Sequence, residues 1–194
     1  RVVKASIKFE VKYLTLYAFS TENFKRPKRE VRALFGILEK FLDTQMQLFK
    51  ENNVRLRIIG ERDKIWQRLR EKIEWFEKET EANDALFLNI ALSYGGRQEI
   101  IRAVKALVEL AKRGAIDPSK IDERLFSDYL YTRDCPDPDL LIRTSGEMRI
   151  SNFLLWQLSY AEIYVTGKLW PDFGEPDLKK AIEEYSKRER RFGK

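Results

Sequence analysis

Leu86-Phe-Leu-Asn-Ile-Ala-Leu-Ser-Tyr-Gly-Gly-Arg97 decides the fold class, and it leads directly into a helical pattern over 97–113. A nearly continuous apolar run that ends in a glycine turn and continues as a helix is typical of a strand covered on both faces in a parallel sheet. Further apolar runs lie at 11–19, 54–59, 140–142 and 163–165, and further helical patterns at 28–51, 61–80, 119–130 and 175–191. This alternation predicts a single α/β domain over residues 1–194, with a central, mainly parallel sheet flanked by helices.

The composition excludes several kinds of site. The chain has 194 residues, no histidine and one cysteine, Cys135, so it has no Ser-His-Asp triad, no Cys-His pair and no imidazole metal ligand. Any metal must then be held by oxygen, which favours magnesium or manganese over zinc. A lone cysteine forms no internal disulfide and fits a reducing compartment. The net charge of +6 fits a solubilising surface, an anionic ligand or a membrane surface.

Two helical segments raise questions that the sequence leaves open. Residues 1–10 resemble the later turns of an amphipathic helix that begins without a capping residue, so we expect that further residues precede Arg1. The pattern over 28–51 carries more apolar residues than one packing face requires. That helix is either buried in the core, or one of its flanks lines an apolar cavity.

The residues that follow each apolar run are the first candidates for a site, because ligands bind beyond the carboxyl ends of strands in an open parallel sheet. Ser20-Thr-Glu-Asn-Phe-Lys-Arg-Pro27 follows the first run, and Arg143-Thr-Ser-Gly-Glu-Met-Arg-Ile-Ser-Asn152 follows the fourth. Ser93-Tyr-Gly-Gly-Arg97 follows the run at 86–92, and its two glycines would let the backbone approach a ligand. Arginines and hydroxyls bind phosphate or diphosphate, so Arg143, Arg149 and Ser151 are candidates to hold such a group. Glu162 lies in an aromatic, apolar stretch, where a carboxylate needs an arginine or a divalent cation as its partner.

Several of these segments resemble signature blocks of the cis-prenyltransferase family, most closely those of bacterial undecaprenyl diphosphate synthases. The matching segments run in order along the chain at 13–27, 54–60, 88–97, 139–157, 160–164, 169–173 and 188–193. The resemblance implies cis-prenyl chain elongation, in which isopentenyl diphosphate is condensed onto an allylic diphosphate such as farnesyl diphosphate. The expected product is a long-chain polyprenyl diphosphate, undecaprenyl diphosphate in particular, which serves as carrier lipid for cell-wall synthesis.

The resemblance also implies how the enzyme is assembled and where it works. It implies a homodimer in which each subunit has a six-stranded parallel sheet and helices that enclose a hydrophobic tunnel. Leu34, Leu38, Phe41 and Leu86 are expected to line this tunnel. Magnesium is the implied cofactor, with Glu162 in the metal site and reaching across the dimer. The protein is expected in the cytoplasm, with transient contact to the inner membrane surface for product release and with no nucleic-acid partner.

The resemblance assigns roles to individual residues as well. Ser20, Asn23 and Arg26 would act as catalytic residues near the reacting carbons. The residues expected to bind substrate are Phe24, Arg26, Arg143, Arg149, Ser151, Arg191 and Gly193. The family's first block, Met-Asp-Gly-Asn-Gly-Arg-Trp, has no counterpart in the sequence, so we expect the N-terminal catalytic block to be missing. Two alternatives stay open, a non-catalytic prenyltransferase-like subunit and a basic nucleic-acid-binding domain.

Overall fold

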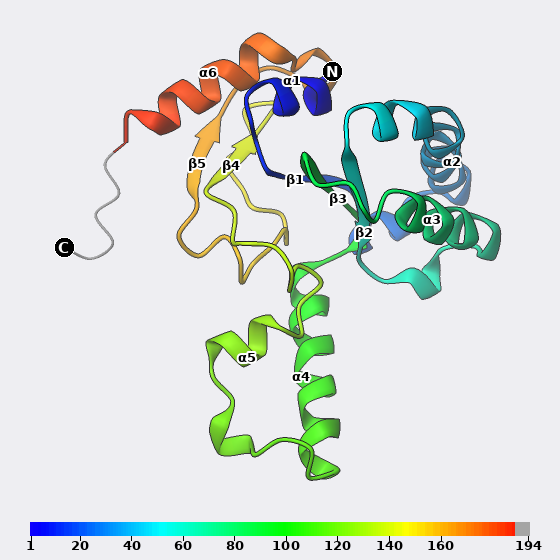
Figure 1. The fold of residues 1–194 in the computed structure, drawn as a ribbon, viewed down its shortest axis with the longest axis vertical. Helices are drawn as coiled ribbons and strands as arrows, with labels where there is room; N and C mark the ends of the chain where they lie inside the picture. Colours follow the sequence, from blue (N-terminus) through cyan, green and yellow to red (C-terminus); the bar gives the residue numbers. More distant parts are fainter. Residues whose placement is uncertain (189–194) are drawn as a thin grey trace.

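The computed structural model describes residues 1–188 and shows parallel strands that alternate with helices (Figure 1). The strands are β1 (Tyr13–Ser20), β2 (Val54–Ile59), β3 (Leu86–Tyr94), β4 (Leu140–Arg143) and β5 (Glu162–Val165). The α-helices are α1 (Val2–Lys8), α2 (Lys28–Glu51), α3 (Gln67–Glu79), α4 (Gly96–Lys112), α5 (Glu123–Ser127) and α6 (Glu175–Ser186). Short 3-10 turns are η1 (Thr21–Lys25), η2 (Arg62–Lys64), η3 (Pro118–Lys120) and η4 (Trp170–Asp172). The predicted α/β class is confirmed.

The first three strands form one parallel sheet in the order β1-β3-β2. β3 is central, and every residue from Leu88 to Tyr94 is buried. A strand that is covered on both faces needs apolar side chains at successive positions, which explains why this stretch shows no polar alternation. Helices α2 and α3 connect β1 to β2 and β2 to β3, and both lie on the same side of the molecule (Figure 1).

A stripe of large side chains joins α2 to this sheet. Phe35, Leu42 and Phe49 follow one another at intervals of seven residues, and each is buried in the main core together with residues of β2, β3 and α3. This spacing keeps the three side chains on one face of the helix. Leu34 and Ile37, in contrast, are 38% and 68% exposed. The apolar content of 28–51 is therefore divided between a buried stripe and an exposed flank.

The last two strands form a separate parallel sheet, in which Leu140 lies opposite Glu162 and Arg143 opposite Val165. The expected six-stranded sheet is not what residues 1–188 form, since they contribute five strands in two sheets. The number six came from the resemblance, whereas the apolar runs themselves indicated five strands. Within the described chain, β1 pairs only with β3 and β4 only with β5, so each of these strands has one edge without a strand partner.

Three helices are shorter than their sequence patterns predicted, and one of them, α6, ends at Ser186 within the pattern over 175–191. The pattern over 61–80 becomes η2 and then α3, because Ile65 adopts an extended backbone and packs into the core. The pattern over 119–130 becomes α5, which begins after Asp122, and the carboxylate of this residue accepts a hydrogen bond from the Leu125 N–H at 2.8 Å. Helix α1 confirms the N-terminal helix. In residues 1–188, no helix has both the length and the hydropathy that a membrane span requires.

Candidate active site

The end of β1 positions the predicted catalytic residues. Ser20 is the last residue of the strand, and its backbone N–H donates to Asn23 Oδ1 at 2.9 Å, which fixes the first turn of η1. Ser20 and Asn23 are half-buried and Arg26 is exposed, so solvent or substrate can reach all three. Phe24 lies differently, because its ring packs edge-on against Phe19 with 4.9 Å between the ring centroids. Phe24 therefore packs against the main core.

The loop after β4 carries the predicted phosphate-binding residues. Arg143 is half-buried at the end of the strand, and its Nε atom is buried without a hydrogen-bond partner in the described structure. The Arg149 side chain is 69% exposed and forms an ion pair with Glu147. Ser151 is exposed and has a left-handed backbone, with φ at +55°. The loop therefore presents guanidinium and hydroxyl groups, the groups that bind diphosphate oxygens.

Asn152 fastens this loop to the segments that follow β1 and β3. Its Nδ2 group donates to Glu22 Oε1 at 2.8 Å and to Gln98 Oε1 at 3.2 Å. Its Oδ1 atom accepts from the Arg97 N–H at 2.9 Å, and its carbonyl accepts from the Gly96 N–H at 2.7 Å. The sequence indicated all three segments as candidate site loops, and the structure brings them together. Sequence reasoning gave Asn152 itself no role, because an uncharged amide at the end of a candidate loop is not a recognisable signal.

Two glycines permit this close approach. A Cβ atom on Gly95 would lie 2.7 Å from Thr21 Oγ1 and 2.8 Å from Asn152 Nδ2, and one on Gly96 would lie 2.8 Å from a Leu155 carbon. Side chains at these positions would therefore push the loop after β4 away from the end of β3. The sequence favoured a glycine turn that admits a ligand, and the structure shows that the glycines admit a neighbouring loop.

Hydrogen bonds around Glu22 keep this residue ionised. Burial alone would raise the pKa of Glu22, but donors surrounding the carboxylate outweigh burial and lower the pKa below its ordinary value. These donors are its own backbone N–H and the side chains of Asn152, Ser20 and Thr21. A fixed negative charge therefore lies between η1, which carries the predicted catalytic residue Asn23, and the loop after β4.

Tyr17 lies beneath the same junction. Burial and the neighbouring charge of Glu22 raise the pKa of Tyr17 to about 12, so its hydroxyl stays protonated at neutral pH. The hydroxyl donates to the Tyr94 carbonyl at 3.2 Å and lies 3.5 Å from the Ser151 carbonyl. Its ring stacks on Phe153, with the ring centroids 4.5 Å apart. Tyr17 thus supports the loop after β4 from the β1 side.

A second polar cluster is buried close to the loop. Glu99 on α4 is 1% exposed and accepts hydrogen bonds from Tyr94 Oη at 2.5 Å, from the Tyr131 backbone N–H at 2.7 Å and from Gln157 Nε2 at 3.2 Å. Burial and the Glu99 charge raise the pKa of Tyr94. Sequence reasoning missed this cluster, because an acidic residue in the first turn of a helix is usually exposed.

The described residues do not form a magnesium site by themselves. Glu162 begins β5, and its Oε2 atom accepts from Arg188 Nη1 at 2.6 Å, so an arginine is the partner that the sequence required. Within residues 1–188, no group of three or more His, Cys, Asp or Glu side chains could hold a metal ion. A single carboxylate that is already paired with a guanidinium is not the set of oxygen ligands that magnesium takes.

The predicted tunnel residues lie in different environments. Leu86 is fully buried at the start of β3, and Leu38 and Phe41 pack against the same core from α2. Leu34 is partly exposed. The terminal substrate-binding residues, Arg191 and Gly193, lie outside the described residues.

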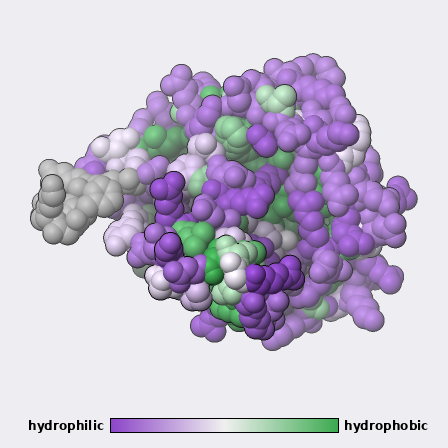
Figure 2. All heavy atoms as spheres, turned by 60° about the horizontal axis from the view of Figure 1, so that its bottom comes forward, coloured by the Kyte–Doolittle hydropathy of each residue, from purple (hydrophilic) through white to green (hydrophobic). Residues whose placement is uncertain are grey.

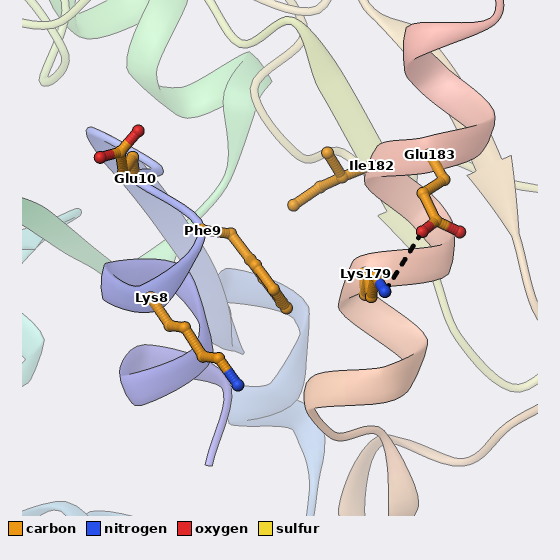
Figure 3. Close-up of a pocket in the computed structure, with 6 residues that line it drawn as sticks. All are labelled: Lys8, Phe9, Glu10, Lys179, Ile182 and Glu183. Carbon is orange, nitrogen blue, oxygen red and sulfur yellow. Dashed lines mark ion pairs between the residues drawn. The ribbon is translucent and has the colours of Figure 1, made fainter.

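A hollow in the surface lies away from these residues, between α1 and α6. Figure 3 shows Phe9 and Ile182 pointing toward each other across it, and Lys179 on its α6 side lies 3.6 Å from Glu183. The residues that line it are Lys8, Phe9, Glu10, Lys179, Ile182 and Glu183. None of the predicted site residues is among them, and the two cations are balanced by two carboxylates.

Known proteins with the same fold place this geometry in a family. The family model described as "Putative undecaprenyl diphosphate synthase" matches residues 1–193. The chain is 50% identical over 193 residues to an isoprenyl transferase of Heliobacterium mobile, covering 100% of this chain and 74% of that protein. It is 49% identical over 193 residues to an isoprenyl transferase of Bacillus subtilis, again covering 100% of this chain and 74% of the relative.

Two solved structures extend the comparison. Lavandulyl diphosphate synthase from Lavandula x intermedia, in complex with dimethylallyl diphosphate, superimposes with a TM-score of 0.96 at 37% identity, covering 100% of this chain and 84% of that one. A "probable undecaprenyl diphosphate synthase" from Campylobacter jejuni gives a TM-score of 0.87 at 41% identity, with 100% and 88% covered. Sequence and fold agree along the entire chain. It is a prenyltransferase and belongs to the undecaprenyl diphosphate synthase family.

Proposed function

We propose that this prenyltransferase elongates an allylic diphosphate with isopentenyl diphosphate and forms a cis double bond in each cycle. The observation that carries the proposal is the bridge at Asn152, which joins the cationic loop after β4 to the end of β1. This bridge brings the candidate diphosphate-binding residues and the candidate catalytic residues to the same edge of the molecule. The bound dimethylallyl diphosphate named for the lavender enzyme supports an allylic diphosphate as one substrate.

The residues take roles that follow from their chemistry. Arg143, Arg149 and Ser151 hold the diphosphate of isopentenyl diphosphate, with charge-assisted hydrogen bonds from the guanidinium groups. The allylic C–O bond breaks, pyrophosphate leaves with the electron pair, and the alkene of isopentenyl diphosphate bonds to the allylic carbon. A proton is then lost to give the new double bond, and Ser20 and Asn23 are the nearby polar groups proposed to assist this loss. Arg26 offsets negative charge that develops on the leaving pyrophosphate.

The remaining proposed substrate contacts come from the resemblance to the family. Phe24, Arg191 and Gly193 belong to the set that the resemblance assigns to substrate, and Phe24 reaches the site from the core side of η1. Magnesium is the proposed cofactor and would neutralise diphosphate charge when bound. Glu162 could supply one ligand, but other ligands must come from outside residues 1–188 of one chain, because these residues hold no cluster for a metal.

The growing prenyl chain needs an apolar environment. Each CH₂ withdrawn from water contributes roughly 0.8 kcal/mol, so a tunnel of apolar residues would accommodate a long product. We propose that Leu34, Leu38, Phe41 and Leu86 line it, and that bulky residues at its far end limit the length of the product. Undecaprenyl diphosphate, a carrier lipid for cell-wall synthesis, is the product that we propose.

We also propose that a sixth strand completes the sheet. The free edges of β1 and β4 both belong to parallel sheets and could accept a strand between them. Such a strand would come from the family's N-terminal catalytic block. The curated relatives described above are longer than the aligned part, since the chain covers 74% of each. Addition of this block should increase both activity and stability.

A second copy of the chain is the proposed partner. Ile101, Val104 and Val108 lie at helical spacing on α4 and are 45–56% exposed, and Ile163 and Val165 are exposed on β5. Figure 2, in which the lower end of the molecule in Figure 1 comes forward, shows apolar patches within a mainly hydrophilic surface. Burial of such patches against a second copy would stabilise a homodimer. Val104→Glu should therefore shift the protein from dimer to monomer in light scattering.

Transient contact with a membrane is proposed because the product is amphiphilic. A basic group at the start of α2 is exposed and would suit anionic lipid headgroups: Lys25, Arg26, Lys28, Arg29 and Arg32. Cosedimentation with phosphatidylglycerol vesicles, compared with phosphatidylcholine vesicles, tests this contact. The proposed location is the cytoplasm, at or near the inner face of the membrane.

The decisive experiment is an assay of the chain joined to the family's N-terminal catalytic block, with farnesyl diphosphate, labelled isopentenyl diphosphate and magnesium, followed by separation of products by chain length. Arg149→Ala should raise the KM for isopentenyl diphosphate by about tenfold or more. Arg133→Ala is the matched control, because Arg133 is also exposed beside an acidic neighbour, Asp134, at 3.5 Å. Absence of labelled product would favour the non-catalytic subunit. Salt-sensitive binding to nucleic acid would favour the basic binding domain.

A further inference from the structure

We propose that Asn152 is a positioning residue. Its bond to Glu22 fixes the distance between the loop after β4, which carries the proposed diphosphate-binding residues, and η1, which carries Asn23. The inference rests on the proposed function, since it assumes that Arg149 and Ser151 bind isopentenyl diphosphate. Asn152 itself is not proposed to contact substrate. It acts through Ser151, its immediate neighbour in the chain.

The hydrogen bonds of Asn152 use all of its polar side-chain atoms. Nδ2 donates to two acceptors, Glu22 Oε1 at 2.8 Å and Gln98 Oε1 at 3.2 Å, and Oδ1 accepts from the Arg97 N–H at 2.9 Å. One side chain therefore joins the segments that follow β1, β3 and β4. Only a residue with a donor and an acceptor in a short planar group satisfies all three segments.

The backbone on either side explains why the loop needs this anchor. Ser151 and Asn152 both have left-handed backbones, with φ at +55° and +61°. Such conformations cost free energy in residues other than glycine and persist only when surrounding contacts impose them. The side chain of Ser151 is exposed, so burial does not hold it in place. The bonds of Asn152, together with the contact between the Tyr17 hydroxyl and the Ser151 carbonyl, therefore constrain the position of the neighbouring hydroxyl.

The substitution Asn152→Asp separates positioning from folding. An aspartate keeps the size of the side chain and the acceptor for Arg97, but it places a second carboxylate against Glu22. The loop should then move away from the end of β1, and the KM for isopentenyl diphosphate should rise about tenfold. The KM for farnesyl diphosphate should change less than threefold, roughly, because the loop after β4 is not assigned to that substrate. Loss of folded protein alone would lower kcat and leave both KM values unchanged.

Reversing the hydrogen bond should rescue the variant. In the double variant Glu22→Gln/Asn152→Asp, the amide of residue 22 can donate to the new carboxylate, so the bridge forms again with donor and acceptor exchanged. Glu22→Gln alone should have a small effect, because its Oε1 can still accept from Asn152. The KM of the double variant should therefore return to within about threefold of the wild-type value, which is a non-additive result.

A matched control comes from α2. Gln47 Nε2 donates to Glu51 Oε1 at 2.9 Å on an exposed surface at the far end of the helix from η1. Gln47→Glu creates the same pair of carboxylates there and should leave both KM values unchanged. Wild-type KM values in Asn152→Asp, or a double variant no better than Asn152→Asp, would overturn the inference while the proposed function stands. Absence of elongation activity in a protein that carries the N-terminal catalytic block would refute the proposed function, and this inference with it.

Discussion

Replacement of Glu99 by glutamine tests whether the buried cluster beside the site is held together by a charge. The Glu99 carboxylate accepts three hydrogen bonds, from Tyr94, Tyr131 and Gln157, and only 1% of the residue is exposed. Glutamine has the same shape but presents one N–H₂ group in place of an oxygen. If this group faces Tyr131 it meets a backbone N–H, and if it faces Gln157 it meets an amide N–H₂.

The expected cost follows from these contacts. Hydrogen bonds to a charged group contribute about 1.5–3 kcal/mol each, and a buried donor left without an acceptor costs about 1–3 kcal/mol. The Tyr94 hydroxyl can rotate and accept, so one donor loses its acceptor rather than all three. We therefore expect Glu99→Gln to lower the free energy of unfolding by about 2–4 kcal/mol.

Urea unfolding at pH 7, followed by tryptophan fluorescence, measures this loss. Glu109→Gln is the control, because Glu109 lies on the same helix but its side chain is 57% exposed and lies 3.3 Å from Lys112. The control should change the free energy of unfolding by less than about 0.5 kcal/mol. Equal losses in the two variants would refute the idea that the cluster depends on a buried carboxylate.

Four further substitutions test other parts of the structure. Leu86→Ala should lengthen the products and lower the free energy of unfolding by about 2–5 kcal/mol, read by product chromatography and urea unfolding; an unchanged product profile removes this residue from the tunnel. Gly60→Ala should lower the free energy of unfolding by more than about 2 kcal/mol, because its Cβ would lie 2.0 Å from the Leu92 carbonyl oxygen in β3. Gly36→Ala, where a Cβ meets no neighbour within 4 Å, should raise the free energy of unfolding by about 0.5–1 kcal/mol. The hydrogen bond from the Gly174 backbone N–H is the main cause that lowers the pKa of Asp177. The stability that this bond contributes is therefore present above the ordinary aspartate pKa and is lost on acidification below about pH 4. Asp177→Asn should flatten this dependence in thermal unfolding, and an unchanged pH profile would contradict it.

The strands and the longest helix were predictable because their signals are local. The run at 54–59 and the pattern over 28–51 match β2 and α2 residue for residue. A buried central strand needs apolar residues at successive positions, and a long amphipathic helix needs a repeating stripe, so both leave clear patterns. The shortened α5 follows from the cap at Asp122, a residue type that favours a helix start, although the pattern over 119–130 runs past it.

The arrangement of the candidate site was predictable only in part. The positions of Arg143 and Ser20 at the ends of strands follow from the apolar runs and from the rule for parallel sheets. The partners of Glu99 and Asn152 lie up to 58 and 130 residues away in the chain, so no local pattern reports them. The sequence left two partners open for Glu162, an arginine or a divalent cation. The three-dimensional structure shows an arginine, Arg188, in contact with it.

The groups proposed to bind diphosphate are exposed, so this site is held in place by the residues next to them. In the proposed function Arg149 and Ser151 meet an anion that arrives from water, and their side chains are exposed rather than fixed by burial. Residues next to them can be fixed: Asn152 binds the loops after β1 and β3, and Phe153 is buried against Tyr17. A change of one anchor should therefore alter substrate affinity before it alters the fold, which distinguishes these positions from the core residues of α2 and β3.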